Sequence, residues 1–483
     1  MGNRLKVDKS LIAPIYAQPG PSQPIDLGAV RVQFIHGGKT YEERAQVAMR
    51  FVPNDQLLFV IPAKREPKDG RIQQPMTGDH TKALLRLAFA PDNDWDGKLT
   101  LLDKGVVLDA FVKGRGGEHG AIAFMPRMSV VTVTPGSTAI SSAVFHLFNF
   151  PKFHGPEDYV LTRGAPPYQA STLCDRSVLK GDGWSITIAA TDKTDEVCKA
   201  LAAQGGYVVT HMGDIKREDG APFTSNQLDD LLRCLHVFLS FVLGCWAGVA
   251  FPAGFDSTGR RVFEQWGIPT TAPGPWNGTC SWFDTQHGEL LSQVFPGFAA
   301  LWRDDTWKDS LWKALYWYLA ANGQGNASTM TDGGTILAQA ALELLAWAYC
   351  VQHRRMVSPK AFEHRGGLEA ADRLRLLATS LGIPLDIPRE SSALHAKAGE
   401  KWQDAMHAIT GIRNALVHPR ARAKLPAGAH LEGWNLSLWY LEMALLRLCG
   451  HNGKYSKRLA MSRWTGNVEP VPWASHEAKQ GEF

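Results

Sequence analysis

Residues 401–418 read KWQDAMHAITGIRNALVH, and this stretch decides how the C-terminal third of the chain is interpreted. Projected on a helix of about 3.6 residues per turn, its apolar side chains form one stripe between Trp402 and Val417. Arg413 lies near the middle of that stripe. Because burying an unpaired guanidinium costs several kcal/mol, we expect Arg413 either to meet a carboxylate or to face a partner or a polar cleft.

His418 stands at the end of the same helix, because Pro419 disfavours a helical conformation for the residue before it. A helix C-terminus favours the protonated imidazole, which suits this side chain to proton transfer near neutral pH. Cleavage of an RNA strand needs such a transfer and a positive charge beside the developing phosphorane, which Arg413 would supply. On spacing alone, an alternative stays open in which Arg413 forms an internal ion pair and His418 caps the helix.

Three further helices are expected around this one. Apolar side chains recur at helical spacing in residues 335–353, 368–381 and 433–449. With residues 401–418, these segments are enough for a small all-α bundle.

The stretch between Asp404 and Glu432 contains no acidic residue, and Arg420, Arg422 and Lys424 lie within it. Local positive charge of this kind attracts phosphate groups. We therefore expect these three cations to bind RNA, with a solvated basic face as the alternative.

The first half of the chain has the pattern of antiparallel strands. Alternating or β-branched runs recur between about Leu27 and Thr224, and glycine- and asparagine-rich turns separate them. The runs cover residues 30–35, 57–61, 84–89, 130–133, 184–190 and 207–211. A short helix is expected at residues 194–204. The pattern predicts an α+β chain of several domains whose N-terminal domain is a β sandwich or a barrel-like sheet.

The helical period begins at Ser225, which has the residue type of an N-cap. Residues 252–279 are too rich in glycine and proline for regular structure, and the helical pattern returns between residues 290 and 321. Four parts are expected: a β-rich sensor or regulatory domain at 1–224, a helical, Trp-rich connector at 225–331, a helical bundle at 332–462 and a C-terminal tail at 463–483.

The seven cysteines indicate a reduced, cytoplasmic protein, because they form no C-x-x-C pair and several lie within apolar runs. The first ten residues are polar and basic, without the apolar region of a signal peptide. Residues 234–253 form an apolar run nearly long enough to span a bilayer. His236 and Ser240 interrupt this run and no second span accompanies it, so we expect a buried helix and no contact with a membrane.

Other features point to structure more than to chemistry. Lys113–Gly117 is a basic, glycine-rich loop, but it lacks the G-x-x-x-x-G-K-[ST] order and a following helix, which favours a hairpin turn. Trp276, Trp282, Trp302 and the tryptophans after them fit a core better than a surface for stacking bases. The sequence contains no H-E-x-x-H motif and no paired carboxylate set, so we expect no metal and no cofactor.

The segment IRNALVHP, residues 412–419, resembles the motif of HEPN-domain ribonucleases: an arginine, a polar residue, three variable positions and a histidine, late in a helix. The upstream segment ILAQAALELLAWAYC, residues 336–350, resembles the long first helix of that family. The resemblance covers residues 332–449. Residues 145–151, FHLFNFP, and 205–220, GGYVVTHMGDIKREDG, resemble large bacterial HEPN proteins of the ApeA type, which place a β-rich domain before the nuclease bundle and act in abortive infection against phage.

The resemblance implies that Arg413 and His418 form a catalytic pair and that Asn414 positions the site. It implies metal-independent cleavage with the 2′-hydroxyl as nucleophile, which leaves a 2′,3′-cyclic phosphate and a 5′-hydroxyl. It also implies a homodimer in which two motifs face each other, with RNA (tRNA among the candidates) as substrate. Glu343, at the margin of the apolar face of residues 335–353, would hold Arg413; an ordinary solvated glutamate is the alternative there.

Two other functions stay open at this stage. The bundle would be a non-catalytic HEPN module for RNA binding or dimerisation if the purified protein left RNA intact. The chain would be the toxin of a toxin–antitoxin pair if the product of an adjacent gene suppressed its toxicity. In the ApeA-like interpretation the N-terminal domain senses a phage-derived trigger.

Overall fold

The computed structural model describes residues 14–16, 18–51, 56–61, 96–112, 122–126, 130–133, 139–156, 176–267, 271, 273–274, 276, 280–324, 331–363, 366–418, 425–460 and 464–474. The chain divides into two compact units, each built from separate segments. The first unit comprises Met1–Asn149, Ala190–Asp229 and Gly248–Trp276, and the second Phe150–Ala189, Asp230–Ala247 and Asn277–Phe483.

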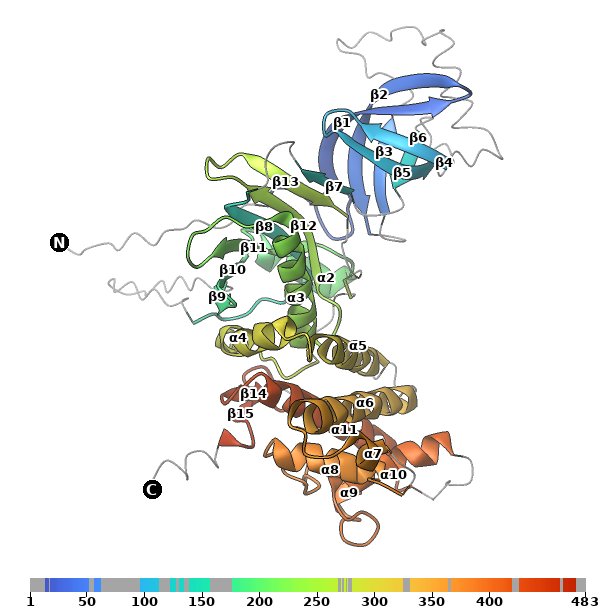
Figure 1. Cartoon of the computed structure of the whole chain (residues 1–483), viewed down its shortest axis with the longest axis vertical. Coiled ribbons are helices and arrows are strands. Elements are labelled where there is room, and N and C mark those ends of the chain that lie inside the picture. The colour runs from blue at the N-terminus through green and yellow to red at the C-terminus, as the bar shows by residue number, and fades with distance from the viewer. Residues whose placement is uncertain are drawn as a thin grey trace, which may run out of the picture. The chain divides into compact units, whose positions relative to one another are not determined.

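Six strands of the first unit close into an antiparallel barrel in the order β1-β2-β3-β6-β5-β4 (Figure 1). Side chains alternate along β1, so that Val30, Val32 and Phe34 are buried inside while Arg31 is exposed. The strands are β1 (Ile25–His36), β2 (Lys39–Arg50), β3 (Gln56–Ile61), β4 (Asp96–Leu101), β5 (Val106–Val112) and β6 (Ile122–Pro126). The α+β class with a β-rich N-terminal region is therefore confirmed, and its first sheet is a barrel.

The first unit also contains five hydrogen-bonded strands in the order β7-β13-β12-β8-β11. These are β7 (Val130–Val133), β8 (Ser142–Phe148), β11 (Val209–Arg217), β12 (Gly248–Phe255) and β13 (Arg261–Trp266), with the helix α2 at Thr194–Gln204. The strands expected at residues 30–35, 57–61 and 130–133 and the helix at 194–204 are confirmed. Residues 84–89 and Lys113–Gly117 lie outside the described residues.

The expectation of irregular structure at residues 252–279 is wrong for its first part, which contains the second half of β12 and all of β13. Pro252 cannot donate a hydrogen bond to a neighbouring strand. The strand accommodates it at a bulge, where the register with β8 shifts between Ala250 and Ala253 and Phe251 has a φ of 49°. The apolar run 234–253 consequently divides between the end of a helix and a strand.

A buried carboxylate joins separate parts of the first unit. Glu264 on β13 accepts hydrogen bonds from the Tyr16 hydroxyl at 2.8 Å and from Lys104 at 2.6 Å, and Arg261 donates a further one. Burial alone would raise the pKa of Glu264, but these hydrogen bonds hold it below its ordinary value. The charge is therefore retained in a site that is almost closed to solvent.

The second unit is mainly helical. Its helices are α3 (Ser225–Leu243, of which the residues up to Asp229 belong to the first unit), α4 (Glu289–Arg303), α5 (Lys308–Gln324), α6 (Thr331–Ala346), α7 (Pro359–Glu363), α8 (Ala370–Ser380), α9 (Ser392–His395), α10 (Ala405–Val417) and α11 (Ala429–Leu448). Its strands are β9 (Arg176–Gly181), β10 (Trp184–Ala190), β14 (Lys454–Ser456) and β15 (Val468–Pro470). Helix α6 continues directly into the π-helix η1 (Trp347–His353) and packs on α5, α8, α10 and α11.

The four helices expected in the C-terminal third are confirmed, with shifted ends. Residues 335–353 fall in α6 and η1, 368–381 in α8, 401–418 in α10 and 433–449 in α11. Within the described part of the chain, one helix, Thr331–His353, is long and apolar enough to cross a membrane by length and composition. Core helices pass the same test, and 61% of its most apolar window is buried.

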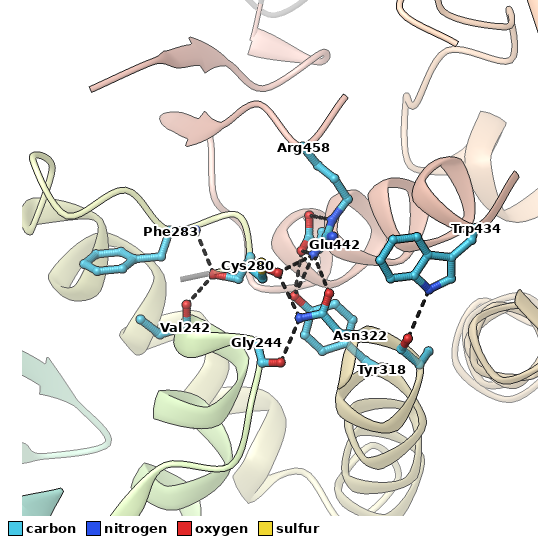
Figure 2. A network of polar contacts seen from close by, with 11 residues as sticks. Val242, Gly244, Cys280, Phe283, Tyr318, Asn322, Trp434, Glu442 and Arg458 are labelled. Carbon is cyan, nitrogen blue, oxygen red and sulfur yellow. Dashed lines mark hydrogen bonds and ion pairs between the residues drawn. The ribbon is translucent and has the colours of Figure 1, made fainter. Parts of the chain in front are cut away.

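The second unit contains a fully buried ion pair (Figure 2). Arg458, which follows α11, places its Nη2 2.5 Å from Oε1 of Glu442, and Nε 3.0 Å from Oε2. The side chains of Arg458 and Glu442 are 3% and 0% exposed. Tyr318 on α5 donates a hydrogen bond of 2.6 Å to the same carboxylate. Burial lowers the pKa of Arg458, but the neighbouring Glu442 carboxylate outweighs this effect and raises it.

The same network reaches two backbone carbonyls. Arg458 Nη2 donates to the carbonyl of Cys280 at 2.6 Å, and Asn322 Nδ2 donates to that oxygen at 2.9 Å and to the carbonyl of Gly244 at 2.7 Å (Figure 2). Two helices, α5 and α11, are thereby tied to the end of α3 and to the segment before α4. Because each group in the network has partners, the buried charges are compensated.

Breaking this pair should destabilise the second unit. Glu442→Gln and Arg458→Met are each expected to lower the free energy of unfolding by about 3–5 kcal/mol, because the remaining charge is buried without its partner. The double variant Glu442→Gln/Arg458→Met should lose much less than the sum of the two single changes. Urea unfolding followed by tryptophan fluorescence measures this, with Lys397→Met in an exposed pair as control. Additive losses would contradict the role of the pair.

Three buried histidines predict sensitivity to acid. Burial lowers the pKa of His146 to about 4, of His211 to about 3 and of His236 to about 4. The unfolded chain binds protons at these positions near pH 6.5, whereas the folded chain does not. Stability is therefore lost as the pH falls from about 6.5 towards about 4, at up to about 1.4 kcal/mol per pH unit for each histidine.

His236→Phe isolates one of these contributions. The His236 ring stacks on Trp246 with 5.3 Å between centroids and 5° between planes, and phenylalanine can keep that contact. In this variant the free energy of unfolding, measured with urea, should fall less steeply between pH 6.5 and pH 4 than in the wild type. His353→Phe, at an exposed position, is the control. An unchanged pH dependence in His236→Phe would contradict the assignment.

Candidate functional site

Helix α10 begins at Ala405 because Asp404 caps it. The Asp404 side chain accepts a hydrogen bond of 2.8 Å from the backbone N–H of His407, and its own backbone is extended. Arg375 on α8 holds this cap through contacts of 2.5 and 3.3 Å to the two carboxylate oxygens. The start of the helix is thus fixed by both its own sequence and a neighbouring helix.

Because α10 begins at Ala405, the apolar stripe expected from Trp402 onward does not begin inside the helix. Trp402 lies before the helix, and its ring packs against Gly411, where an added Cβ would meet Cζ3 at 2.6 Å. The placement of Arg413 beside Trp402 on one helical face is therefore wrong. Arg413 is half-buried in the last turn of α10, past the last buried residue, Ile412.

Among the described residues Arg413 makes one hydrogen bond, in which Nη1 donates to Oδ1 of Asn414 at 3.2 Å. Within the described residues no carboxylate forms an ion pair with it. The expectation that Glu343 holds Arg413 is wrong: the Glu343 carboxylate accepts a hydrogen bond from Gln339 at 2.8 Å and lies 3.7 Å from Arg373. Arg373 on α8 is therefore the cation beside Glu343.

His418 forms the C-cap of α10. Its backbone is extended, with φ −114° and ψ 107°, and its N–H donates to the carbonyl of Asn414 at 3.0 Å. The side chains of Asn414 and His418 are exposed. Arg420, Arg422 and Lys424, expected to bind RNA, lie outside the described residues.

The end of α10 lies against the start of α11. Gly433 packs on the side chain of Ile412, where an added Cβ would meet Cδ1 at 2.5 Å. His430, one turn earlier on α11, lies near Asp332 at the start of α6, with 3.6 Å between Nδ1 and Oδ1. Sequence reasoning missed both residues, because 332 and 430 are far apart along the chain and carry no shared motif.

The last turn of α10 can bind an anion and exchange a proton with it. Among the described residues Arg413 carries a fixed positive charge without an acidic partner, and the exposed His418 imidazole can accept a proton when neutral and donate one when charged. Beside them, Ala415, Leu416 and Val417 are only half-buried. A polar, phosphate-compatible surface thus borders a partly exposed apolar one.

The tryptophans fall mostly in the core. Trp282, Trp302 and Trp307 are buried, whereas Trp312 on α5 is 39% exposed. In the part of the chain that the structure describes, no group of three or more His, Cys, Asp or Glu side chains could hold a metal ion.

Comparison with known proteins finds similarity to a prophage-derived protein. A family model described as the YopA C-terminal domain matches residues 304–469, and one described as the YopA central domain matches residues 135–277. The SPbeta prophage-derived uncharacterized protein YopA of Bacillus subtilis (strain 168) is 28% identical over 309 residues, which cover 62% of this chain and 67% of that protein. No solved structure matches. The first match includes α5 to α11, so the similarity extends over α10.

The contact between α10 and α11 should control the geometry of this site. Gly433→Ala forces the new methyl group against Ile412 Cδ1 and should cost about 1–3 kcal/mol of stability. Ile412→Val removes that Cδ1 and alone should cost about 0.5–1.5 kcal/mol. The double variant should be more stable than Gly433→Ala, a rescue measured by urea unfolding. Strictly additive losses would show that the two side chains do not meet.

Proposed function

We propose that the chain is a metal-independent endoribonuclease of the HEPN type. One observation carries the proposal: the last turn of α10 presents Arg413, Asn414 and His418 in the order of the HEPN motif, with Arg413 free of any acidic partner among the described residues. The motif lies late in a helix that packs with α6, α8 and α11, which is the context that the resemblance requires.

The proposed reaction cleaves RNA by attack of the 2′-hydroxyl on the adjacent phosphorus. Arg413 neutralises the charge that develops on the phosphorane, and Asn414, which already accepts a hydrogen bond from Arg413, orients the guanidinium. His418 moves a proton at an oxygen of the scissile phosphodiester. The products are a 2′,3′-cyclic phosphate and a 5′-hydroxyl.

The half-buried apolar side chains beside the motif support a homodimer. Ala415, Leu416 and Val417 continue the apolar side of α10 into solvent, and Leu431 at the start of α11 is 52% exposed. In this proposal a second copy covers these residues and brings its own motif opposite, so that RNA is cut at the interface.

The biological part of the proposal is abortive infection against phage in the cytoplasm. The β-rich unit would sense a phage-derived trigger and restrain the nuclease until then. The relative from Bacillus subtilis is prophage-derived by its description, which supports a role connected with phage. RNA, with tRNA among the candidates, would be the substrate.

Arg413→Ala and His418→Ala test the site. Each should lower the rate of RNA cleavage by about 10²–10⁴-fold in excess EDTA, because charge stabilisation or proton transfer is lost. Product ends are read by whether polynucleotide kinase labels the new 5′-hydroxyl directly. Arg354→Ala and His353→Ala, exposed residues at the other end of the α6–η1 helix, are the matched controls and should cleave like the wild type.

Three other results would each contradict part of the proposal. Growth arrest and cleavage retained in both Arg413→Ala and His418→Ala would exclude this site. Cleavage by the wild type that EDTA abolishes would exclude the metal-independent mechanism. A wild-type protein that binds RNA and leaves it intact would establish the non-catalytic alternative.

A further inference from the structure

Helices α10 and α11 run in opposite directions, so the end of one lies beside the start of the other. At one end of the pair, Asp404 is close enough to Tyr440 for its charge to add to the burial that raises the pKa of this tyrosine. At the other end, Ile412 packs on Gly433. Continuing the same antiparallel register, the residues after Arg413 approach the first turn of α11.

That first turn holds an imidazole paired with a carboxylate from a third helix. Nδ1 of His430 lies 3.6 Å from Oδ1 of Asp332. The Nδ1 atom is buried and has no hydrogen-bond partner within the described residues. The His430 side chain is nevertheless 45% exposed, so the ring edge that carries Nε2 faces solvent.

The first turn of α6, which carries Asp332, packs tightly against α11. Gly334, two residues on, packs so closely on α11 that an added Cβ would lie 2.6 Å from Trp434 Nε1. Trp434 in turn donates to the carbonyl of Ala321 at 3.0 Å (Figure 2). Asp332 and His430 are therefore held together by the packing of the two helices that carry them.

Among the described residues, the charged group recorded beside His430 is Asp332 of α6. Arg413 follows Ile412, which packs on Gly433 one turn after His430, and His418 ends the same helix. Glu432 on α11 is engaged elsewhere, because its carboxylate accepts the backbone N–H groups of Ala393 and Leu394 at 3.0 and 2.9 Å. The acidic partner of His430 among the described residues is thus Asp332.

We propose that His430 is a second proton-transfer residue of the RNA-cleaving site, with Asp332 as its positioning residue; this inference rests on the proposed ribonuclease function. A carboxylate beside Nδ1 favours the tautomer with the proton on that atom, which leaves a lone pair on the exposed Nε2. His430 is therefore the general base, and His418 is the general acid.

The proton transfers balance in a single step. Nε2 of His430 takes the proton of the 2′-hydroxyl as the 2′-oxygen forms its bond to phosphorus. The bond from phosphorus to the 5′-oxygen breaks, and protonated His418 gives its proton to that leaving oxygen. Arg413 holds the non-bridging oxygens throughout. Water then restores the two imidazoles to their starting protonation states, and no oxidation or reduction takes place.

The test compares full-length wild type, His430→Ala, Asp332→Asn, His418→Ala and the control His353→Ala for cleavage of one RNA in EDTA between pH 5 and pH 9. His430→Ala should cleave about 10²–10⁴-fold more slowly and lose the acidic limb of the pH–rate profile, because the base is gone. Added imidazole should restore part of that rate. Asp332→Asn should keep His430 and shift the acidic limb, with a smaller fall in rate.

The outcomes separate this inference from the proposed function. If the wild type cleaves RNA and His418→Ala does not, a His430→Ala variant with wild-type rate and pH profile overturns the inference alone. A slow His430→Ala variant that keeps the wild-type pH profile and does not respond to imidazole would show a merely structural role and overturn it too. If the wild type cleaves no RNA, the inference falls together with the proposed function. Circular dichroism of each variant checks that it is folded.

Discussion

The helical unit depends on one constraint, which is that the buried charge of Arg458 must be compensated. Its partner Glu442 comes from α11, and the oxygens of Tyr318, Asn322 and Cys280 complete the surroundings of the pair. Desolvating two charges is costly, so the arrangement is stable only when α5, α11, the end of α3 and the segment before α4 all take their places. Other packings of these helices would leave a buried charge uncompensated, so the ion pair disfavours them.

That packing explains why the candidate site is both ordered and open. Helix α11 is buried along most of its length, and α10 lies against it from Asp404 to Ile412. Beyond Ile412 the support ends, so Arg413, Asn414 and His418 extend from a rigid base. In the antiparallel register of α10 and α11, the first turn of α11 follows this end, and it carries His430, 3.6 Å from Asp332 at the start of α6. Separate helices thus supply the groups, and close glycine contacts at 334 and 433 set their spacing.

Much of the fold could be predicted from the sequence, because it follows from local periodicity. Alternation of apolar side chains located β1 and β3, and helical spacing located α6, α8, α10 and α11. The failures have particular causes. Glycine and proline suggested irregular structure after residue 252, but a bulge absorbs Pro252 within β12. A helical projection that began at Lys401 misplaced Arg413, because the cap at Asp404 starts α10 later.

The sequence alone determined the order of Arg413, Asn414 and His418 and the amphipathic pattern of the helix that ends with them, since both are properties of neighbouring residues. It also determined the α+β composition of the chain. Only the tertiary structure decided that Glu343 pairs with Arg373, that Arg413 keeps no acidic partner among the described residues, and that Asp332 meets His430. The physical reason is that a pair between two helices depends on the register and direction in which the helices pack. Contacts among residues that are far apart in the sequence set both.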